Sequence, residues 1–251
     1  MAVDDAYTVS LLHFDGADES TAFTDESGKS WTRSGGAKID TAQSKFGGAS
    51  GYFDGNGDWI TTATHTDFNF GTGNFTVDCW AYPVTGGTNY PTILASGKTT
   101  WAAGCVGFSF VTASNTYSFG GNGMTGVASG VITKDTWSHL AVVRSGTALK
   151  IYVNGTQSGS ATDGGAYDFS NTSTMIGRTG WATDAYWYGW IDELRVSKGI
   201  ARWTADFTPP AYPYPIPSAS KTTWFFMQQT KRLWDNVGGF YVPRQQGLVT
   251  I

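Results

Sequence analysis

Apolar and polar residues alternate with a period of two along much of this chain. Within residues 75–82 the apolar side chains occupy every second position, which is the pattern of a β-strand with both faces partly covered. Residues 138–153 contain two such runs separated by the turn sequence "SGT", and Asn154-Gly155 follows them. An Asn-Gly pair suits a type I′ turn, because both central residues of that turn need a positive φ. The pattern predicts a strand over 75–82 and a β-hairpin over 138–153.

The same criteria mark further strand candidates, separated by glycine-rich turns, at residues 8–14, 50–54, 58–62, 92–96, 106–112, 116–119, 174–178 and 188–197. The sequence "DGNGD" at 54–58 falls between two of them. It is too short for an EF-hand calcium loop and lacks the distal glutamate, so we expect a hairpin turn there. Many short strands with glycine turns predict an all-β fold of two stacked antiparallel sheets.

Composition agrees with this fold class. The chain of 251 residues has 33 glycines, 15% aromatic and only 14% charged residues, which favours strands and tight turns over helices. The first residues lack the basic segment and apolar core of a signal peptide, and no later run has the length of a membrane span. We therefore expect no signal peptide, no membrane insertion, and reduced thiols in the core at Cys79 and Cys105.

Proline divides the chain. Five of its eight prolines lie in one short stretch, where fixed φ and missing donors favour an extended, unpaired backbone: Pro209, Pro210, Pro213, Pro215 and Pro217. This predicts a body at 1–208, a proline-rich linker at 209–217 and an arm at 218–251. Residues 1–217 carry 12 basic and 19 acidic groups, and this acidic body argues against a nucleic-acid partner.

The arm combines a net charge of +3 with apolar clusters that are too short to build a core. We expect it to dock on an identical chain, giving a homo-oligomer, or on another protein of the same assembly. The docking residues would be Trp224, Phe225, Phe226, Trp234, Phe240 and Tyr241.

Several motifs together resemble a known family. "LLHFDG", "FTVDCWAYP", "IGR" and "GWIDELRVSKGIARWTADFTPP" occur in the order found in laminin-G-like domains of the concanavalin A-like lectin/glucanase superfamily, over roughly residues 7–210. The chain is most similar to versions found in bacteriophage structural proteins. The resemblance implies a jelly-roll sandwich of two antiparallel sheets, followed by the C-terminal arm. It does not imply one activity, because one fold hosts many functions.

The carboxylates argue against an enzyme. Glycoside hydrolysis needs two carboxylates flanking the bond, and the glucanase relatives carry them as an E-x-D-x-E run that is absent here. Asp192 and Glu193 are neighbours in a predicted strand, so they should point to opposite faces. We expect Glu193 to face outward beside a base, and we expect no catalytic residues. His139, within the hairpin, is expected to be structural.

Calcium is a second use for the acids. The resemblance implies one structural Ca²⁺ where the first and last strands of the body meet, held by Asp15, Asp192 and carbonyls of the "KFGGAS" loop. The alternative is that Asp15 caps a turn and Asp192 accepts backbone hydrogen bonds.

Aromatic residues gather in "TGWATDAYWYGW". Sugar rings stack on exposed aromatic faces, so Trp101, Trp181, Tyr186 and Trp187 are candidates to line a glycan groove or a protein contact, with Tyr188 and Trp190 facing into the sandwich. The alternative is a loop folded over its own aromatics.

Two functions follow. The first is a non-enzymatic virion protein, a capsid decoration or a tail or fibre component, made in the host cytoplasm and anchored by its arm. The second is a carbohydrate-binding module for a host or environmental polysaccharide.

Overall fold

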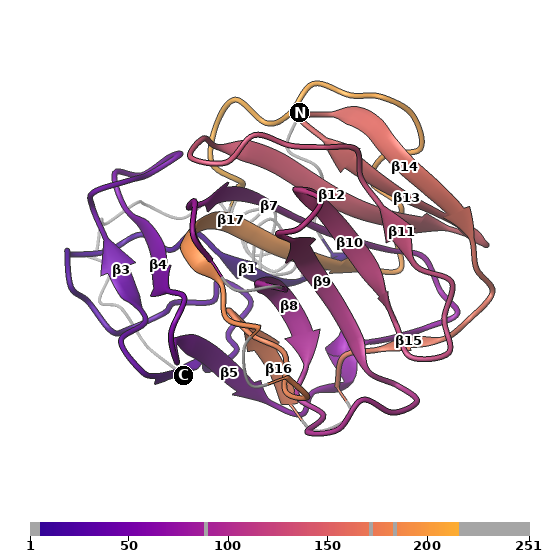
Figure 1. The fold of residues 1–251 in the computed structure, drawn as a ribbon, viewed down its shortest axis with the longest axis horizontal. Coiled ribbons are helices and arrows are strands. Elements are labelled where there is room, and N and C mark those ends of the chain that lie inside the picture. The colour runs from indigo at the N-terminus through magenta and orange to yellow at the C-terminus, as the bar shows by residue number, and fades with distance from the viewer. Residues whose placement is uncertain (1–5, 88–89, 171–172, 183–184, 216–251) are drawn as a thin grey trace, which may run out of the picture. The chain divides into compact units, whose positions relative to one another are not determined.

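The computed structural model describes residues 6–87, 90–170, 173–182 and 185–215, which form two antiparallel sheets packed face to face (Figure 1). The back sheet has the order β14-β13-β12-β7-β17-β4-β3, with β1 also paired to β17. Its strands are β1 (Thr8–Leu12), β3 (Lys38–Asp40), β4 (Ser50–Asp54), β7 (Phe75–Pro83), β12 (Ser138–Ser145), β13 (Ala148–Val153), β14 (Thr156–Thr162) and β17 (Tyr188–Lys198).

The front sheet, nearer the viewer in Figure 1, has the order β11-β10-β9-β8-β16-β5-β2. Its strands are β2 (Thr32–Ser34), β5 (Trp59–Ala63), β8 (Thr92–Ser96), β9 (Val106–Val111), β10 (Thr116–Gly121), β11 (Val127–Ala128) and β16 (Ser173–Ile176). A small pair, β6 (Asn69–Gly71) with β15 (Tyr167–Asp168), and one 3₁₀ turn, η1 (Thr66–Phe68), complete the described elements. The predicted all-β, two-sheet sandwich is confirmed. None of the described helical segments has the length and hydropathy needed to cross a membrane.

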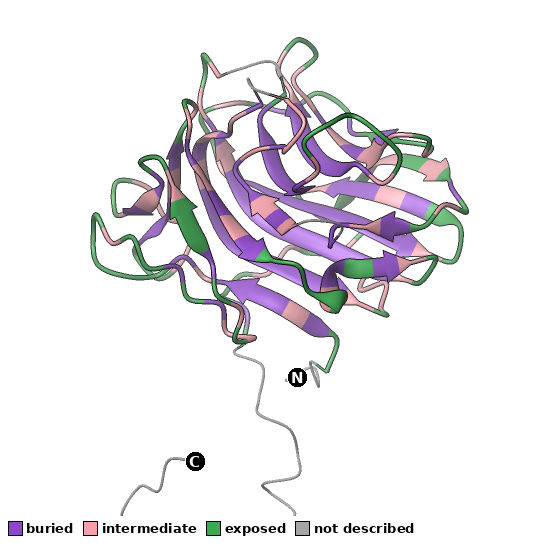
Figure 2. Cartoon of the chain, turned by 90° about the horizontal axis from the view of Figure 1, so that it is seen from below, coloured by how far each residue is buried: buried purple, intermediate pink, exposed green. Residues whose placement is uncertain are grey.

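The core lies between the two sheets and follows the period of two. On β9, Val106, Phe108 and Phe110 are buried in the core, and the residues between them face outward. Figure 2 shows the buried residues along the strands of both layers and the exposed ones mainly in the loops. Each fully buried large apolar side chain contributes about 1.5–3 kcal/mol to stability. Cys79 and Cys105 are buried free thiols, as expected.

The turns agree with the sequence at one place and differ at another. Asn154 and Gly155 both have positive φ, at 50° and 80°, as a type I′ turn requires. The "DGNGD" segment is not a hairpin turn, because β4 pairs within the back sheet and β5 within the front sheet. It is a crossover between the layers, and the Asp58 carboxylate holds it by accepting hydrogen bonds from the amides of Asp54 and Gly36.

The outer face of the back sheet is covered by the chain that follows β17. Trp203 and Phe207 stack with ring centroids 4.0 Å apart and pack on Tyr152. Tyr214 is only 6% exposed although it lies among the prolines, and its amide donates to Glu193 Oε2 at 2.7 Å. The backbone there is anchored, in contrast to the unpaired linker that we expected. The three predicted segments stay predictions, and the six arm residues lie outside the described residues.

Candidate functional site

A pocket of about 550 Å³ opens on the outward face of the front sheet. Its floor is made by two cross-strand pairs of β9 and β10, Gly107 opposite Gly120 and Ser109 opposite Ser118. Side chains at alternate positions share a face, so both glycines point away from the core. The sheet therefore has a depression without side chains at its centre, bordered by two hydroxyls.

Aromatic residues form the wall. Trp101 and Trp181 are in contact, with ring centroids 5.3 Å apart and planes at 55°, and Tyr90 lines the same pocket. The Trp181 indole lies over the floor, because a Cβ added to Gly107 would be 3.4 Å from its Cη2 atom. β11 contributes Ala128, which is paired with Ser118 of the floor. A methyl group at residue 107 would therefore be in van der Waals contact with the Trp181 indole.

The two loops that carry the tryptophans support each other. Gly180 lies against the backbone of Gly97 and Lys98, too close for any side chain at that position. Within the Trp101 loop, the Lys98 ammonium donates to the Ala103 carbonyl at 2.6 Å. The Cys105 thiol donates to the Thr100 carbonyl at 3.0 Å, so this core thiol also holds the loop.

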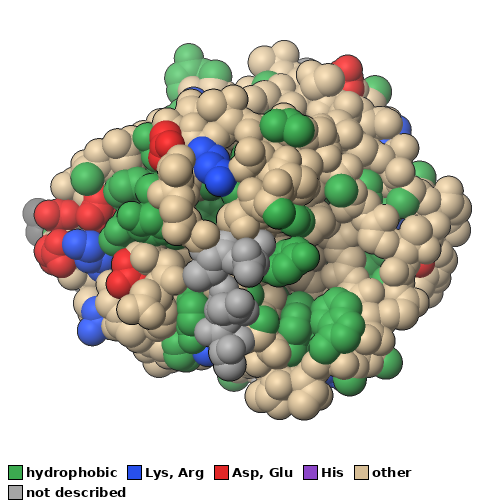
Figure 3. Space-filling view, viewed as in Figure 1, with side chains coloured by type: hydrophobic (Ala, Val, Ile, Leu, Met, Phe, Trp, Pro, Cys, Tyr) green, Lys and Arg blue, Asp and Glu red, His purple; other side chains and the backbone are tan. Residues whose placement is uncertain are grey.

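The exposure of these rings is unusual for the molecule. Five large hydrophobic residues are exposed in the described part of the chain, and two of them, Tyr90 at 57% and Trp101 at 56%, line this pocket. Figure 3 shows this face of the molecule, with hydrophobic side chains set among uncharged surface and with acidic and basic groups gathered mainly at the left. Apolar, aromatic-lined pockets with a few polar groups are the common form of small-molecule sites.

Sequence reasoning found part of this site. The structure brings Trp101 and Trp181 together as candidates, but Tyr186 lies outside the pocket, against Trp59. Trp187 is fully buried in the core, so it cannot be a surface contact; instead Trp190, expected inside, packs on Tyr52 of the outer face. The expected orientations were reversed: Trp187 and Ile191 lie in the core, so Tyr188 and Trp190, at the positions between them, face the other side of the sheet.

Tyr90, Ser118 and the glycine pair are not among the residues that the sequence predicts for this site. The outward positions of the predicted strands 106–112 and 116–119 include Gly107 and Ser118, so the alternation contained a signal. That signal does not reveal the pocket floor, because the floor needs Gly107 to lie opposite Gly120, and this register is known only from the pairing of β9 with β10.

Asp192 is buried and has one free oxygen. Its Oδ2 atom accepts hydrogen bonds from the amides of Lys45 at 2.8 Å and Phe46 at 3.1 Å, whereas Oδ1 has no partner among the described residues. Burial raises the pKa of Asp192 to about 7, against these two hydrogen bonds. The Asp15 carboxylate lies beside Gly47 of the same loop. Asp192 therefore accepts backbone hydrogen bonds, as the alternative to calcium binding expected. Its second oxygen is still available to a cation, so the calcium site stays a prediction.

Glu193 does not face solvent as expected. It is 1% exposed, with Oε1 at 2.7 Å from His13 Nδ1, so the expected base is present. Between two consecutive pairs, Asp192 with Trp80 and Arg195 with Asp78, β17 spans three positions and β7 only two. The extra residue is taken up near Glu193, which has a φ of +51°. This β-bulge breaks the strict alternation on which the expectation relied. The hydrogen bond between the His13 ring and the Glu193 carboxylate raises the pKa of His13.

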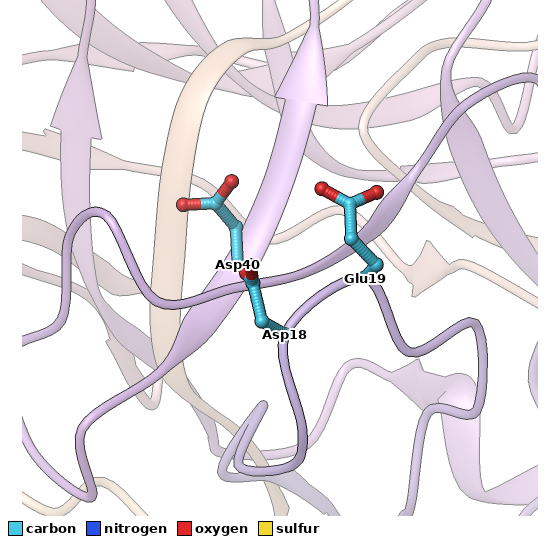
Figure 4. A group of neighbouring side chains, drawn as sticks. All are labelled: Asp18, Glu19 and Asp40. Atoms are coloured by element: carbon cyan, nitrogen blue, oxygen red, sulfur yellow. The ribbon is translucent and has the colours of Figure 1, made fainter.

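The exposed Asp18 and Glu19 and the half-buried Asp40 form an acidic group whose carboxylate oxygens lie within 4.8 Å of one another (Figure 4). Each already has a partner in the protein. Lys38 pairs with Glu19 and lies 3.5 Å from Asp40, and the Thr41 amide donates to Asp18 at 3.0 Å. This group needs no cation to explain it.

Comparison with known proteins places the fold. The model of the concanavalin A-like lectin/glucanases superfamily, in its laminin G form, matches residues 54–202, more than half of the chain. The chain belongs to this superfamily. A search of curated proteins found no match. The predicted family is thus confirmed, whereas the similarity to bacteriophage versions stays a prediction.

Solved structures share the superfamily's fold. Domain 4 of AbnA, a GH43 extracellular arabinanase from Geobacillus stearothermophilus, in complex with arabinotriose, is 23% identical with a TM-score of 0.58, over 78% of this chain and 95% of that one. The binding domain of Paraclostridial Mosquitocidal Protein 1 is 12% identical with a TM-score of 0.59, over 77% of this chain and 49% of that one. Botulinum neurotoxin type C, whose cell entry depends upon interaction with two ganglioside molecules, is 12% identical with a TM-score of 0.56, over 80% of this chain and 50% of that one. This chain matches about half of each toxin chain, and such identities establish the fold alone.

Proposed function

We propose that this superfamily member is a carbohydrate-binding module and that its ligand occupies the pocket formed by Trp101, Trp181 and the glycine floor. The observation that carries the proposal is the pair of tryptophans, one of them exposed, held over a floor without side chains. Sugar rings present flat C–H surfaces that pack on aromatic faces, and their hydroxyls need a few polar partners.

The polar partners are present at the floor. Ser109 Oγ is paired with Thr92 Oγ1 at 2.8 Å, whereas the Ser118 hydroxyl has no hydrogen-bond partner among the described residues. Ser118 is then the hydroxyl available to a ligand. The arabinotriose and ganglioside ligands of the structural neighbours support the proposal by analogy only.

The test is binding calorimetry with arabinotriose, soluble arabinan, xylan, galactan and β-glucan. Trp101→Ala should weaken binding of the tightest ligand about 30-fold, because aromatic residues at binding hot spots contribute about 2 kcal/mol or more. Tyr212→Ala is the control, since Tyr212 is 79% exposed and does not line the pocket. If no member of the panel binds, or if Trp101→Ala binds as tightly as the wild type, the proposal fails.

The virion role remains compatible with this proposal, because a surface module of a particle can also bind glycans. It depends on the arm at 218–251 and predicts that removing the arm abolishes self-association or particle binding. We also expect no hydrolysis of the panel polysaccharides. Reducing sugar released by the wild type and lost in a single acid variant would contradict that expectation.

A further inference from the structure

Arg178 lies at the back of the loop that carries Trp181, outside the pocket. Its guanidinium carbon is 4.5 Å from the ring centroid of Trp59 on β5 and 5.1 Å from that of Tyr186. The two rings are themselves in contact, with centroids 6.1 Å apart. Cation–π attraction to two rings fixes the guanidinium in one place.

From that place the guanidinium holds the loop backbone. Its Nε donates to the Thr179 carbonyl at 2.8 Å and its Nη2 to the Ala182 carbonyl at 3.3 Å. The Ala182 amide in turn donates to Thr179 Oγ1 at 3.3 Å. These contacts bracket Trp181 on both sides in the sequence, so the segment 179–182 is closed around the tryptophan that covers the pocket floor.

The base of the loop is closed independently of Arg178. The Trp187 amide donates to the Gly177 carbonyl at 2.7 Å, and the Gly177 amide donates to Ile93 on β8 at 3.2 Å. Losing the guanidinium should therefore leave the two ends of the loop attached to the sheet. What it should change is the conformation of the four residues that present Trp181.

We propose that Arg178 is the positioning residue of the sugar site, acting through the segment 179–182 that presents Trp181; this inference rests on the proposed function. An arginine can make both backbone contacts from one planar group while lying against aromatic rings, whereas a lysine offers a compact point charge. A loop held in its bound conformation before the ligand arrives loses less entropy on binding. Arg178→Lys keeps the charge and removes the fork, so it should weaken binding about tenfold.

The test is a double-mutant cycle with the panel sugar that the wild type binds most tightly, measured by calorimetry on the full chain. Arg178→Lys should raise Kd about tenfold in the wild type and less than twofold in Trp181→Ala, because coupled residues give non-additive effects. Arg33→Lys is the matched control, since Arg33 is on β2 and does not line the pocket. A role limited to stability would lower affinity equally in both backgrounds, and that result would overturn the inference.

Tyr186→Leu gives a second, independent variant. It removes one of the two rings beside the guanidinium without altering a pocket residue, and it should weaken binding in the same direction. The failures are distinguishable. If Trp181→Ala binds like the wild type, the pocket is not the sugar site and the proposed function fails. If Trp181→Ala binds weakly while Arg178→Lys and Tyr186→Leu bind normally, only the role of Arg178 is refuted.

Discussion

Replacing Tyr214 by phenylalanine tests how firmly the proline-rich segment is attached to the body. The Tyr214 hydroxyl donates to Asp78 Oδ2 and lies 3.1 Å from His139 Nε2. Burial raises the pKa of Tyr214 well above 10, so the hydroxyl keeps the proton that it donates. Its ring packs on Arg195, with the guanidinium carbon 3.7 Å from the centroid. Phenylalanine keeps that packing and removes only the hydroxyl.

The expected loss follows from the charge of the acceptor. Asp78 is fully buried and ionised, and a hydrogen bond to such a group contributes about 1.5–3 kcal/mol to the free energy of unfolding. Asp78 keeps its two bonds from Arg195, at 3.1 and 3.0 Å, so the loss should stay within that range. A loss of 2 kcal/mol corresponds to a fall in Tm of about 4–8 °C for a domain of this size.

The assay is urea unfolding followed by tryptophan fluorescence, with Tyr212→Phe as the control because Tyr212 is exposed. A chain ending at Thr208 should be destabilised further than Tyr214→Phe, since it also deprives Glu193 of the Tyr214 amide. An unfolding midpoint for Tyr214→Phe equal to that of the wild type would mean that this anchor contributes nothing in solution.

Three further predictions concern the floor, the buried acid and the metal. Gly107→Val should abolish sugar binding while retaining the folded fluorescence spectrum, because its side chain meets the Trp181 indole; unchanged Kd would contradict this. Burial raises the pKa of Asp78, but Arg195 and His139 outweigh it and hold the pKa at about 2, against 3.8 unfolded. The free energy of unfolding should therefore fall by about 2 kcal/mol as the pH falls from 4 to 2, measured by urea titration at each pH, and Asp78→Asn should lack this fall. Chelation should lower the Tm of the wild type but not of Asp192→Asn; equal melting of the wild type with calcium and with chelator would remove the metal.

The strands that sequence reasoning found are those whose alternation is apolar. β7, β9 and β12 lie at the predicted positions because their core-facing residues mark every second position. β14 was missed, since "TQSGSAT" lies at the edge of the back sheet and has little to bury. Edge strands are stabilised by pairing with a neighbour, and pairing leaves no periodic signal in their own residues.

The site was predictable to the extent that it depends on exposed aromatics. Trp101 was recognised as a candidate by residue type, but Arg178 and Gly107 were not considered. Their roles arise from neighbours that are distant in the sequence, Trp59 for Arg178 and Trp181 for Gly107. A residue that acts by fixing a neighbouring side chain, or by leaving space for one, can be identified only once the pairing of strands is known.

The bulge in β17 makes the same point for the opposite sheet. Without the extra residue, Asp192 and Glu193 would alternate, and one of them would lie in the core between the sheets. With it, Glu193 reaches both His13 and the Tyr214 amide, and Arg195 comes into register with Asp78. The anchoring of the proline-rich segment therefore depends on one inserted position. The hydrophobic pattern marks that position, because the core residues Ile191 and Leu194 are three residues apart where strict alternation requires two. The residue that absorbs the extra position is a glutamate in the left-handed region, where side chains of that size are uncommon.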